Sequence, residues 1–361
     1  MFRDTLFYQR VAKLADFLPA IFFFAGFAWD ALTIGRNVAT SDLFIFTAYL
    51  LAAGSLLFIM SRPSFILADQ AQMPKLFRWF FSTNWPYLGL QFFFGSLLSA
   101  LFILYFKSAN HALAILMTVL LGVLLVANEF LENAYRRFTL SWALFGLCAM
   151  LLFNFLLPFL LGSVHAIWFY LSTLLGATMV IFLYSKTPQH LGSILPVWMI
   201  AGFLMFAYAI DMIPPVPLVK REIAIAYDVK KEGDHYYLTQ QRVGWWAIWS
   251  KTSNRLTLTP SQRVYCFSSI FAPSGLEARL YHNWQKRTDK DGWKSIQRVG
   301  FDVSGGRQNG YRGYTYKTNL SPGKWRVSVE TENKKTIAIQ PFTVSTVSEE
   351  TKPPRYVVFK Y

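Results

Sequence analysis

A hairpin with two facing arginines is the first candidate for chemistry in this chain. It falls in a stretch rich in glycine, arginine and tyrosine, residues 305–317. Asn-Gly is the strongest short hairpin signal, and with Asn309 and Gly310 at the two turn positions Arg307 lies opposite Arg312. Like charges that face each other in a sheet are unfavourable unless an anion lies between them. The pattern therefore predicts an anion at this hairpin.

The anion at the hairpin has two alternative sources. A carboxylate of the protein, Glu277 or Asp302, is the source that we favour, because nearby groups commonly satisfy arginine. The alternative is a bound ligand. Tyr311, Tyr314 and Lys317 complete the group on this strand, and its tyrosines either stack on a sugar or pack within the domain.

His282 and Trp284 are the remaining candidate ligand-binding residues. None of the five histidines lies at metal-ligand spacing with another, and no Ser/His/Asp or Cys/His pattern accompanies them. We expect His282 to be structural, bonded to backbone across the strands. Cys148 and Cys266 lie in different parts of the chain, which argues against a disulfide and a cysteine metal site. We therefore expect no catalytic residue, no metal and no cofactor.

Three acidic residues lie in or near apolar segments: Asp30, Glu129 and Asp211. An ionisable residue inside a membrane is a functional hypothesis by default. For Asp30 and Asp211 we favour the alternative that each reaches the membrane interface or meets a basic group, because both lie near segment ends. A solvated helix end explains Glu129 as well as a site would.

The composition separates the chain into two parts. Of its 361 residues 54% are hydrophobic and 15% charged, against roughly 25% charged in an ordinary soluble domain. Residues 1–215 hold 11 Lys and Arg against 8 Asp and Glu, whereas residues 216–361 hold 24 against 12. The composition therefore argues against an ordinary soluble enzyme. We expect a polytopic transmembrane helical domain over residues 1–215 and a basic domain over residues 216–361.

Seven apolar runs are candidates for membrane spans, since a bilayer core of ~30 Å needs about 20 apolar residues in a helix. They are Leu14–Ile34, Leu43–Met60, Tyr87–Phe106, Ala112–Phe130, Leu140–Leu161, Ala166–Tyr184 and Leu191–Ile213. With the N-terminus in the cytoplasm, nine Lys and Arg lie in the inside segments, and only Arg36 and Lys107 lie outside. An odd number of spans then makes the C-terminal domain extracytoplasmic.

The basic part contains short strand patterns separated by Gly, Pro and Asn turns, which predict an antiparallel, immunoglobulin-like β-sandwich. One run, Val243–Ser250, is apolar on both faces. We expect it to be a buried strand, with a strand that places Trp246 and Ile248 at the headgroup level as the alternative. The other runs are Ile223–Val229, Tyr236–Trp249, Arg255–Thr259, Val264–Phe271, Ala278–Gln285, Ser295–Val303, Tyr311–Asn319, Lys324–Glu330 and Thr336–Val344.

Several motifs together resemble the bacterial domain of unknown function numbered 2914. They are Val264-Tyr265-Cys266-Phe267, Tyr281-His282-Asn283-Trp284, Gly305-Gly306-Arg307, Gly310-Tyr311-Arg312-Gly313-Tyr314-Thr315 and Gly323-Lys324-Trp325-Arg326-Val327. The apolar part is similar to the membrane block that often precedes this domain, at Gln91-Phe92-Phe93-Phe94-Gly95 and Ala127-Asn128-Glu129-Phe130. The resemblance implies a bacterial inner-membrane protein with a β-rich appendage and no assigned activity.

These features predict a scaffold or binding protein of the cell envelope and not an enzyme. The expected partners are the lipid bilayer and an anionic glycan, lipid headgroup or envelope protein that meets the basic domain. Nucleic acid is not expected. The alternative is a transporter or channel-like protein whose β domain is a lid over the outer mouth, in which Asp30 and Asp211 face the bundle interior.

Overall fold

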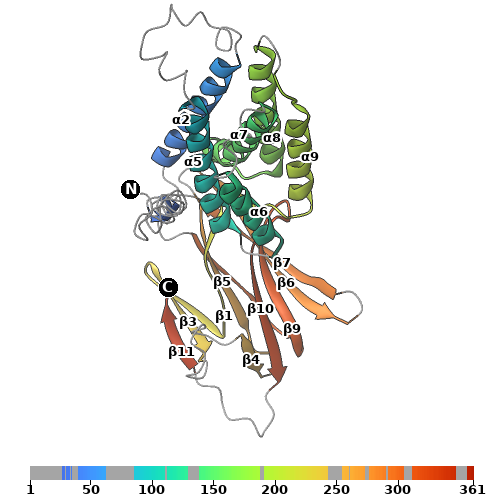
Figure 1. The fold of residues 1–361 in the computed structure, drawn as a ribbon. Coiled ribbons are helices and arrows are strands. Elements are labelled where there is room, and N and C mark those ends of the chain that lie inside the picture. The colour runs from blue at the N-terminus through green and yellow to red at the C-terminus, as the bar shows by residue number, and fades with distance from the viewer. Residues whose placement is uncertain are drawn as a thin grey trace, which may run out of the picture. The chain divides into compact units, whose positions relative to one another are not determined.

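The computed structural model describes residues 27–28, 30–32, 34, 40–61, 85–109, 112–128, 138–187, 191–242, 254–259, 261–272, 276–289, 292–304, 311–346 and 356–361. The chain forms two compact units, one mainly of helices and one that holds the strands (Figure 1). The strand unit comprises Lys107–Leu116, Phe155–Tyr170 and Ala207–Tyr361. It therefore includes short helical stretches as well as the strands.

Apolar runs form the helices α2 (Thr40–Met60), α5 (Trp85–Ser108), α6 (Ala112–Asn128), α7 (Phe138–Leu161), α8 (Ala166–Ser185) and α9 (Leu195–Ala209). Four of them, α2, α5, α7 and α8, are long and apolar enough to cross a membrane. The helices α6 and α9 have 17 and 15 residues, about 26 and 23 Å at 1.5 Å per residue. They are shorter than a bilayer core of ~30 Å.

The described residues thus support four of the seven predicted spans. The first predicted span, Leu14–Ile34, lies largely outside the described residues. The apolar helices are compatible with a membrane protein.

Close packing and polar contacts join α7 to α8. A Cβ atom added at Gly176 would lie 2.8 Å from the Met150 Cα atom, so the two backbones approach closely where α8 has no side chain. Asn154 Oδ1 accepts hydrogen bonds from Ser172 and from Thr173, the latter at 3.2 Å.

The strands follow in the order β1 (Val219–Ala226), β2 (Asp228–Glu232), β3 (His235–Gln241), β4 (Arg255–Leu258), β5 (Val264–Phe271), β6 (Glu277–Thr288), β7 (Gly292–Ser304), β8 (Tyr311–Lys317), β9 (Gly323–Thr331), β10 (Thr336–Thr346) and β11 (Tyr356–Lys360). The sheets have the orders β1-β5-β8, β4-β10-β9-β6-β7 and β11-β3-β2. Their ladders are antiparallel except for β4 with β10, which is parallel.

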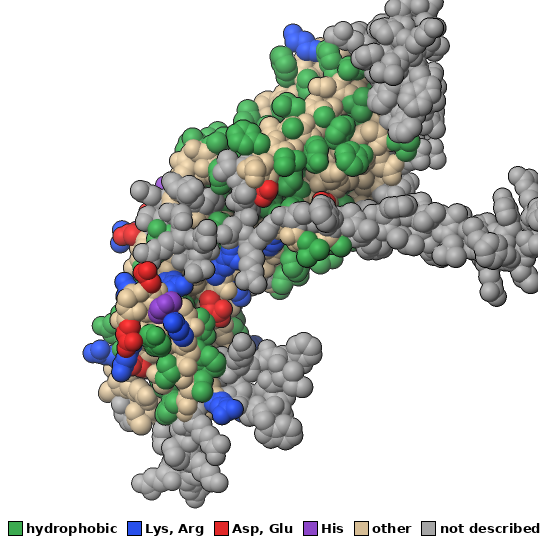
Figure 2. All heavy atoms as spheres, turned by 90° about the vertical axis from the view of Figure 1, so that its left-hand side faces the viewer, with side chains coloured by type: hydrophobic (Ala, Val, Ile, Leu, Met, Phe, Trp, Pro, Cys, Tyr) green, Lys and Arg blue, Asp and Glu red, His purple; other side chains and the backbone are tan. Residues whose placement is uncertain are grey.

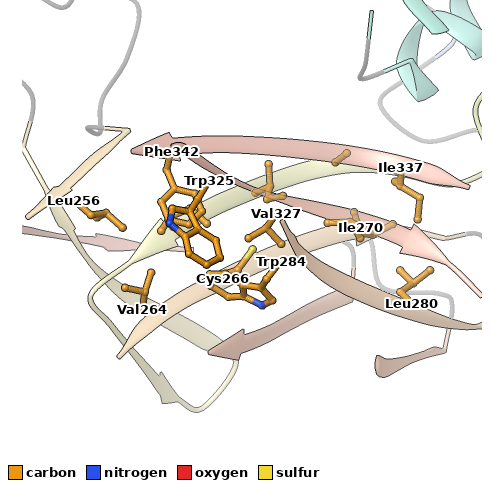
Figure 3. Close-up of a cluster of buried hydrophobic side chains, with 14 of the residues drawn as sticks. Leu256, Val264, Cys266, Ile270, Leu280, Trp284, Trp325, Val327, Ile337 and Phe342 are labelled. Carbon is orange, nitrogen blue, oxygen red and sulfur yellow. The ribbon is translucent and has the colours of Figure 1, made fainter. Parts of the chain in front are cut away.

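One buried cluster takes side chains from two of these sheets (Figure 3). Val264 and Cys266 come from the β1-β5-β8 sheet, whereas Leu280, Trp284 and Val327 come from the five-stranded sheet. Each of these side chains is fully buried. The two sheets therefore turn one face each toward a common core, and a second, smaller cluster joins the β11-β3-β2 sheet to the other face of β1 and β5.

The predicted Asn-Gly hairpin is wrong in its strand pairing. The flanking strands belong to different sheets, because β7 pairs with β6 and β8 pairs with β5. A Cβ atom added at Gly313 of β8 would lie 2.8 Å from the Phe301 ring of β7, so these strands pack face to face and not edge to edge. The turn itself, with Arg307, lies outside the described residues, as does the predicted strand Val243–Ser250.

Candidate functional site

The strand β6 sends adjacent side chains to opposite faces of its sheet, as the period of two requires. His282 pairs with Val329 of β9 on the core face, whereas Asn283 pairs with Arg298 of β7 and Ser328 of β9 on the outer face. Both faces carry buried polar groups.

The inner cluster consists of Ser268, His282, Trp284 and Thr315. His282 Nε2 lies 2.8 Å from Ser268 Oγ, and His282 Nδ1 lies 2.9 Å from Thr315 Oγ1. Trp284 Nε1 donates to the same Thr315 Oγ1 at 3.2 Å. Complete burial lowers the pKa of His282 to about 3, so the ring is neutral at pH 7. At His282 Nδ1, where a catalytic triad has a carboxylate, the partner is the Thr315 hydroxyl. This cluster has the features of a structural network.

The outer cluster consists of Asn283, Ser295, Arg298, Ser328 and Glu330. Glu330 is 6% exposed, and its Oε1 accepts hydrogen bonds from Asn283 Nδ2 at 2.9 Å and from Ser328 Oγ at 2.5 Å. Its Oε2 lies 3.5 Å from Arg298 Nε. Ser295 Oγ donates to Asn283 Oδ1 at 2.6 Å. A buried carboxylate is thus paired and hydrogen-bonded, as burial of a charge requires.

Arginines on the same outer face form what we call the arginine strip. Its members alternate with aromatic and polar side chains along β6, β7 and β9 and are Arg279, Arg287, Arg298 and Arg326.

Aromatic rings contact three of these arginines, and the longest contact is that of Arg279, at 5.9 Å from the Tyr281 ring centroid. The Arg298 guanidinium lies 3.6 Å from the Tyr281 ring centroid, and that of Arg326 lies 4.5 Å from the Trp293 ring centroid. Arg326 Nε also donates to Gln285 Oε1 at 2.5 Å. Burial lowers the pKa of Arg326, and the neighbouring Glu330 carboxylate opposes this effect. A ring fixes a guanidinium without neutralising it.

Few carboxylates compensate the arginine strip. In the described part of the chain, ion pairs within 4.0 Å join Arg298 to Glu330 and Arg279 to Asp302. The second pair is loose, at 3.7 Å, and its side chains are 61% and 86% exposed. Arg287 and Arg326 have no such partner among these residues.

The structure divides the predicted ligand-binding residues between two environments. His282 and Trp284 belong to the inner cluster. Tyr311 packs against the core, and Lys317 Nζ donates to Gln297 Oε1 at 3.2 Å. Arg312 and Tyr314 alternate with Tyr311 and Lys317 along β8 and therefore lie on its other face. There Arg312 pairs with Ser269 and Tyr314 with Phe267 of β5. The predicted residues therefore do not form one site.

Tyr314 belongs to a group of aromatic residues that we call the tyrosine face, with Tyr265 and Tyr316. The Tyr265 ring centroid lies 6.1 Å from that of Tyr314 and 5.7 Å from that of Tyr316. Tyr314 and Tyr316 are 43% and 49% exposed. Arg263 lies 5.1 Å from the Tyr316 centroid.

Arg312 bonds to main-chain oxygens and not to the carboxylate that the sequence predicts. Its Nη1 donates to Asp234 O at 2.6 Å and to Tyr361 O at 3.2 Å. Asp302 is instead the partner of Arg279. The prediction overlooked the β11-β3-β2 sheet. Asp234 lies between β2 and β3 and Tyr361 follows β11, and their carbonyl oxygens accept from Arg312.

The polar residues predicted in the membrane part have separate environments. Asp30 accepts a hydrogen bond from Ser99 Oγ at 2.7 Å. Asp211 lies beyond the end of α9 and accepts from the Thr336 backbone N–H at 3.2 Å. Glu129 lies outside the described residues.

Lys335, in the β9–β10 turn, caps the C-terminal end of α9. Its Nζ donates to Tyr208 O and, at 3.1 Å, to Ala209 O. Carbonyl groups at a helix C-terminus are orphaned acceptors at the negative end of the helix dipole, so a lysine is favourable there. Burial lowers the pKa of Lys335, and Asp211 opposes this shift.

Metal ligands do not gather in the part of the chain that the structure describes, where no three His, Cys, Asp or Glu side chains are placed to hold an ion. Cys148 and Cys266 are both buried free thiols.

The sequence interpretation missed the outer cluster and the arginine strip. The signal was present in Lys324–Glu330, whose alternation places Arg326, Ser328 and Glu330 on one face. Ser328 and Glu330 on this polar face are buried. The long side chains that cover them come from β6 and β7, which local alternation does not reveal.

Solved structures share only weak, partial likeness with this chain. A β-glucosidase from Listeria innocua in complex with gluconolactone has 11% identity and a TM-score of 0.20, over 33% of this chain and 17% of that one. A β-glucosidase from Kluyveromyces marxianus has 9% identity and a TM-score of 0.17, over 43% and 18%. The alkylpurine DNA glycosylase AlkC of Pseudomonas fluorescens, bound to DNA containing an abasic site analog, has 10% identity and a TM-score of 0.19, over 84% and 98%.

This chain thus spans about a sixth of the length of the β-glucosidases, and these matches carry no argument about fold or function. No curated protein matches the chain. A family model does match, over residues 277–344, and its description is "Protein of unknown function (DUF2914)". The region that carries the arginine strip and the outer cluster is therefore a match to the DUF2914 family.

Proposed function

We propose that this chain is a multi-pass membrane protein whose C-terminal β domain binds an anionic partner along the arginine strip. The observation that carries the proposal is that aromatic rings contact Arg298 and Arg326, and that Arg326 has no carboxylate within 4.0 Å in the described part of the chain. Such guanidinium groups are oriented and keep their charge, which suits bidentate contacts with carboxylate or phosphate. Envelope proteins and lipid headgroups are alternative partners to the glycan that we favour.

The shape of the strip favours an extended polyanion such as an anionic glycan. Arg279 and Arg287 lie near the two ends of β6, eight residues apart, which is about 27 Å at ~3.4 Å per residue. Residues 216–361 carry 24 Lys and Arg against 12 Asp and Glu. On the face drawn in Figure 2, charged side chains gather over the strands, whereas hydrophobic side chains cover the helices. Such a field attracts anionic partners over a distance of about a Debye length.

We also propose the topology of seven spans, with the N-terminus in the cytoplasm of a bacterium and the β domain outside the inner membrane. The bias of nine inside cations against two outside supports it. Further support comes from the strand unit, which includes Lys107–Leu116 and Phe155–Tyr170, because these stretches contain two of the three connections that the same topology puts outside. The shared core of two sheets supports the proposal that the strands form an immunoglobulin-like sandwich.

The test is binding of the full chain, in lipid nanodiscs, to polygalacturonate as a carboxylated glycan, with neutral dextran as the comparison polymer. We expect binding at low salt that weakens steeply as salt screens the charges. Arg326→Gln should lower the affinity about tenfold, since hydrogen bonds to charged groups contribute about 1.5–3 kcal/mol. Arg255→Gln is the matched control, because Arg255 is an exposed arginine on β4 outside the strip.

Three results would overturn the proposal: no binding to polygalacturonate at low salt, equal binding to dextran, or an equal loss with Arg255→Gln. Failure with polygalacturonate together with capture of anionic vesicles by the same strip would make the partner a lipid surface.

A further inference from the structure

A small pocket lies where the connection between two apolar helices meets the strands. The helices α7 and α8 are both long and apolar enough to cross a membrane, and four residues, 162–165, join them. A connection this short places both helix ends at the same membrane surface. On the proposed membrane-spanning role of these helices, on which this inference rests, the connection lies at the level of the lipid headgroups.

The β domain meets this connection within the strand unit. Val164 packs against the main core cluster, so the connection is fixed to the strands. Beside it is a pocket of about 70 Å³, lined by Ser163, Val164, His165, Ala278, Arg279, Thr331, Glu332 and Asn333. Because a single water needs only about 10–15 Å³ by this measure, the pocket admits a phosphate-sized group.

The lining side chains combine one cation with one carboxylate. Arg279 is a guanidinium that matches a phosphodiester, and its pair with Asp302 is loose at 3.7 Å. Ser163, His165 and Asn333 add neutral hydrogen-bonding groups at the same pocket. Glu332 supplies the negative charge that a ligand ammonium group would meet. The complement of this lining is a zwitterion with a phosphodiester at one end and an ammonium at the other.

Apolar side chains flank the same connection. Leu160 and Leu161 at the end of α7 are 68% and 50% exposed, and Ile167 in the first turn of α8 is 55% exposed. Exposed apolar groups on a membrane helix suit acyl chains. In the same turn of α8, the buried Trp168 indole N–H has no acceptor among the described residues. Tryptophan is typical of the headgroup level.

We propose that this pocket binds the headgroup of a membrane phospholipid that carries a primary ammonium group, as in phosphatidylethanolamine. Arg279 contacts the phosphodiester, Glu332 contacts the ammonium group, and the acyl chains lie along the exposed leucines. The lipid thereby fixes the β domain at the membrane surface.

The test is native mass spectrometry of the full chain, released from micelles that contain equal amounts of dioleoyl phosphatidylethanolamine, phosphatidylglycerol and phosphatidylcholine. We expect retained phosphatidylethanolamine to exceed each of the others about fivefold, since only this lipid offers both charges with ammonium N–H donors. Arg279→Gln should lower its retention about fivefold. Glu332→Gln should remove the preference over phosphatidylglycerol and keep binding of the phosphodiester.

Arg255→Gln is the control for general loss of surface charge, and thermal unfolding checks that each variant is folded. Equal retention of the three lipids, or the same loss in Arg255→Gln and Arg279→Gln, would overturn the proposal. Soluble glycerophosphoethanolamine at millimolar concentration tests whether the natural ligand is a soluble molecule with the same headgroup instead of a membrane lipid. If it binds as well as the lipid, the ligand is a soluble phosphodiester and the lipid proposal is wrong.

The two proposals share Arg279, so Arg326 and Glu332 are the residues that separate them. Loss of polygalacturonate binding in Arg326→Gln with lipid retention unchanged would leave the lipid proposal standing, whereas loss of the lipid preference in Glu332→Gln with polygalacturonate binding unchanged would show that the pocket is distinct from the rest of the strip.

Discussion

The inner and outer clusters meet at two adjacent residues of β6, His282 in the inner cluster and Asn283 in the outer one. They differ in what covers them. The inner cluster around His282 lies between two sheets and consists of neutral donors and acceptors. The outer cluster around Glu330 carries charge, and the Arg298 side chain that contacts it is 27% exposed. A ligand can displace the Arg298 side chain from the outer cluster, whereas the inner cluster is covered by a whole sheet that a ligand cannot displace.

The difference therefore separates stability from binding. In the inner cluster each lost contact leaves a buried group unsatisfied, which costs about 1–3 kcal/mol. In the outer cluster water or an anion can compensate part of the loss. We expect changes in the inner cluster to act on folding and changes in the outer cluster to act on both folding and anion binding.

The largest expected effect is that of Trp284→Ala in the inner cluster. Trp284 is fully buried and donates to Thr315, so its truncation should lower the free energy of unfolding by about 3–5 kcal/mol. Trp293→Ala on the outer face is the matched control. Its ring is half-buried and supports Arg326, so the expected loss is about 1 kcal/mol or less. Hydrogen exchange of the β5, β6 and β9 amides in the full chain measures both losses. Equal losses would remove the distinction between the clusters.

The second effect is the dependence of stability on pH through His282. Its pKa is about 3 in the folded chain and about 6.5 in the unfolded chain. Above pH 6.5 the ring is neutral in both states. As the pH falls from 6.5 toward 3, the unfolded chain binds a proton that the folded chain does not. Stability should therefore fall by about 1.4 kcal/mol per pH unit, or about 2 kcal/mol at pH 5.

The variant His282→Gln tests this pH dependence. It removes the titrating ring and retains an amide that can bond to Ser268 and Thr315, so its stability should change less between pH 7 and pH 5 than that of the natural chain. Hydrogen exchange, corrected for the chemical exchange rate at each pH, gives both slopes. Parallel slopes would show that His282 does not control the acid response.

The alternation of apolar and polar residues predicted several strands, because this signal lies within the sequence of each strand. The run Val264–Phe271 matches β5 at both ends, and Lys324–Glu330 lies within β9, where Trp325, Val327 and Val329 face the core. His282 does form bonds across the strands, but its partners are the hydroxyls of Ser268 and Thr315 and not the backbone groups that the sequence interpretation expected. These features depend on residues that are close in sequence or share one buried face.

Pairing between distant strands could not be predicted in the same way. The Asn-Gly signal placed Arg307 and Arg312 in one hairpin, but the ladder of β8 with β5 depends on contacts across about 40 residues. Likewise Glu330 gains its partners from β6 and β7, so its burial does not follow from the alternation of β9 alone. Composition therefore indicated a basic, aromatic domain, whereas the residues of the outer cluster and the arginine strip did not follow from it.

The smallest effect, Glu330→Gln, sharpens the comparison because stability and binding should change in opposite directions. The amide keeps the shape of the carboxylate and removes the charge that faces Arg298. Water reaches the partly exposed Arg298 side chain, so the expected loss of stability is only about 1–2 kcal/mol. The freed arginine charge should raise the affinity for polygalacturonate.

Asp302→Asn is the control, and since both members of its ion pair are exposed, its stability should change by about 0.5 kcal/mol or less. Hydrogen exchange and glycan binding on the same preparations give both quantities. Weaker glycan binding in Glu330→Gln would mean that the carboxylate orients the arginine strip and does not merely compete with its ligand.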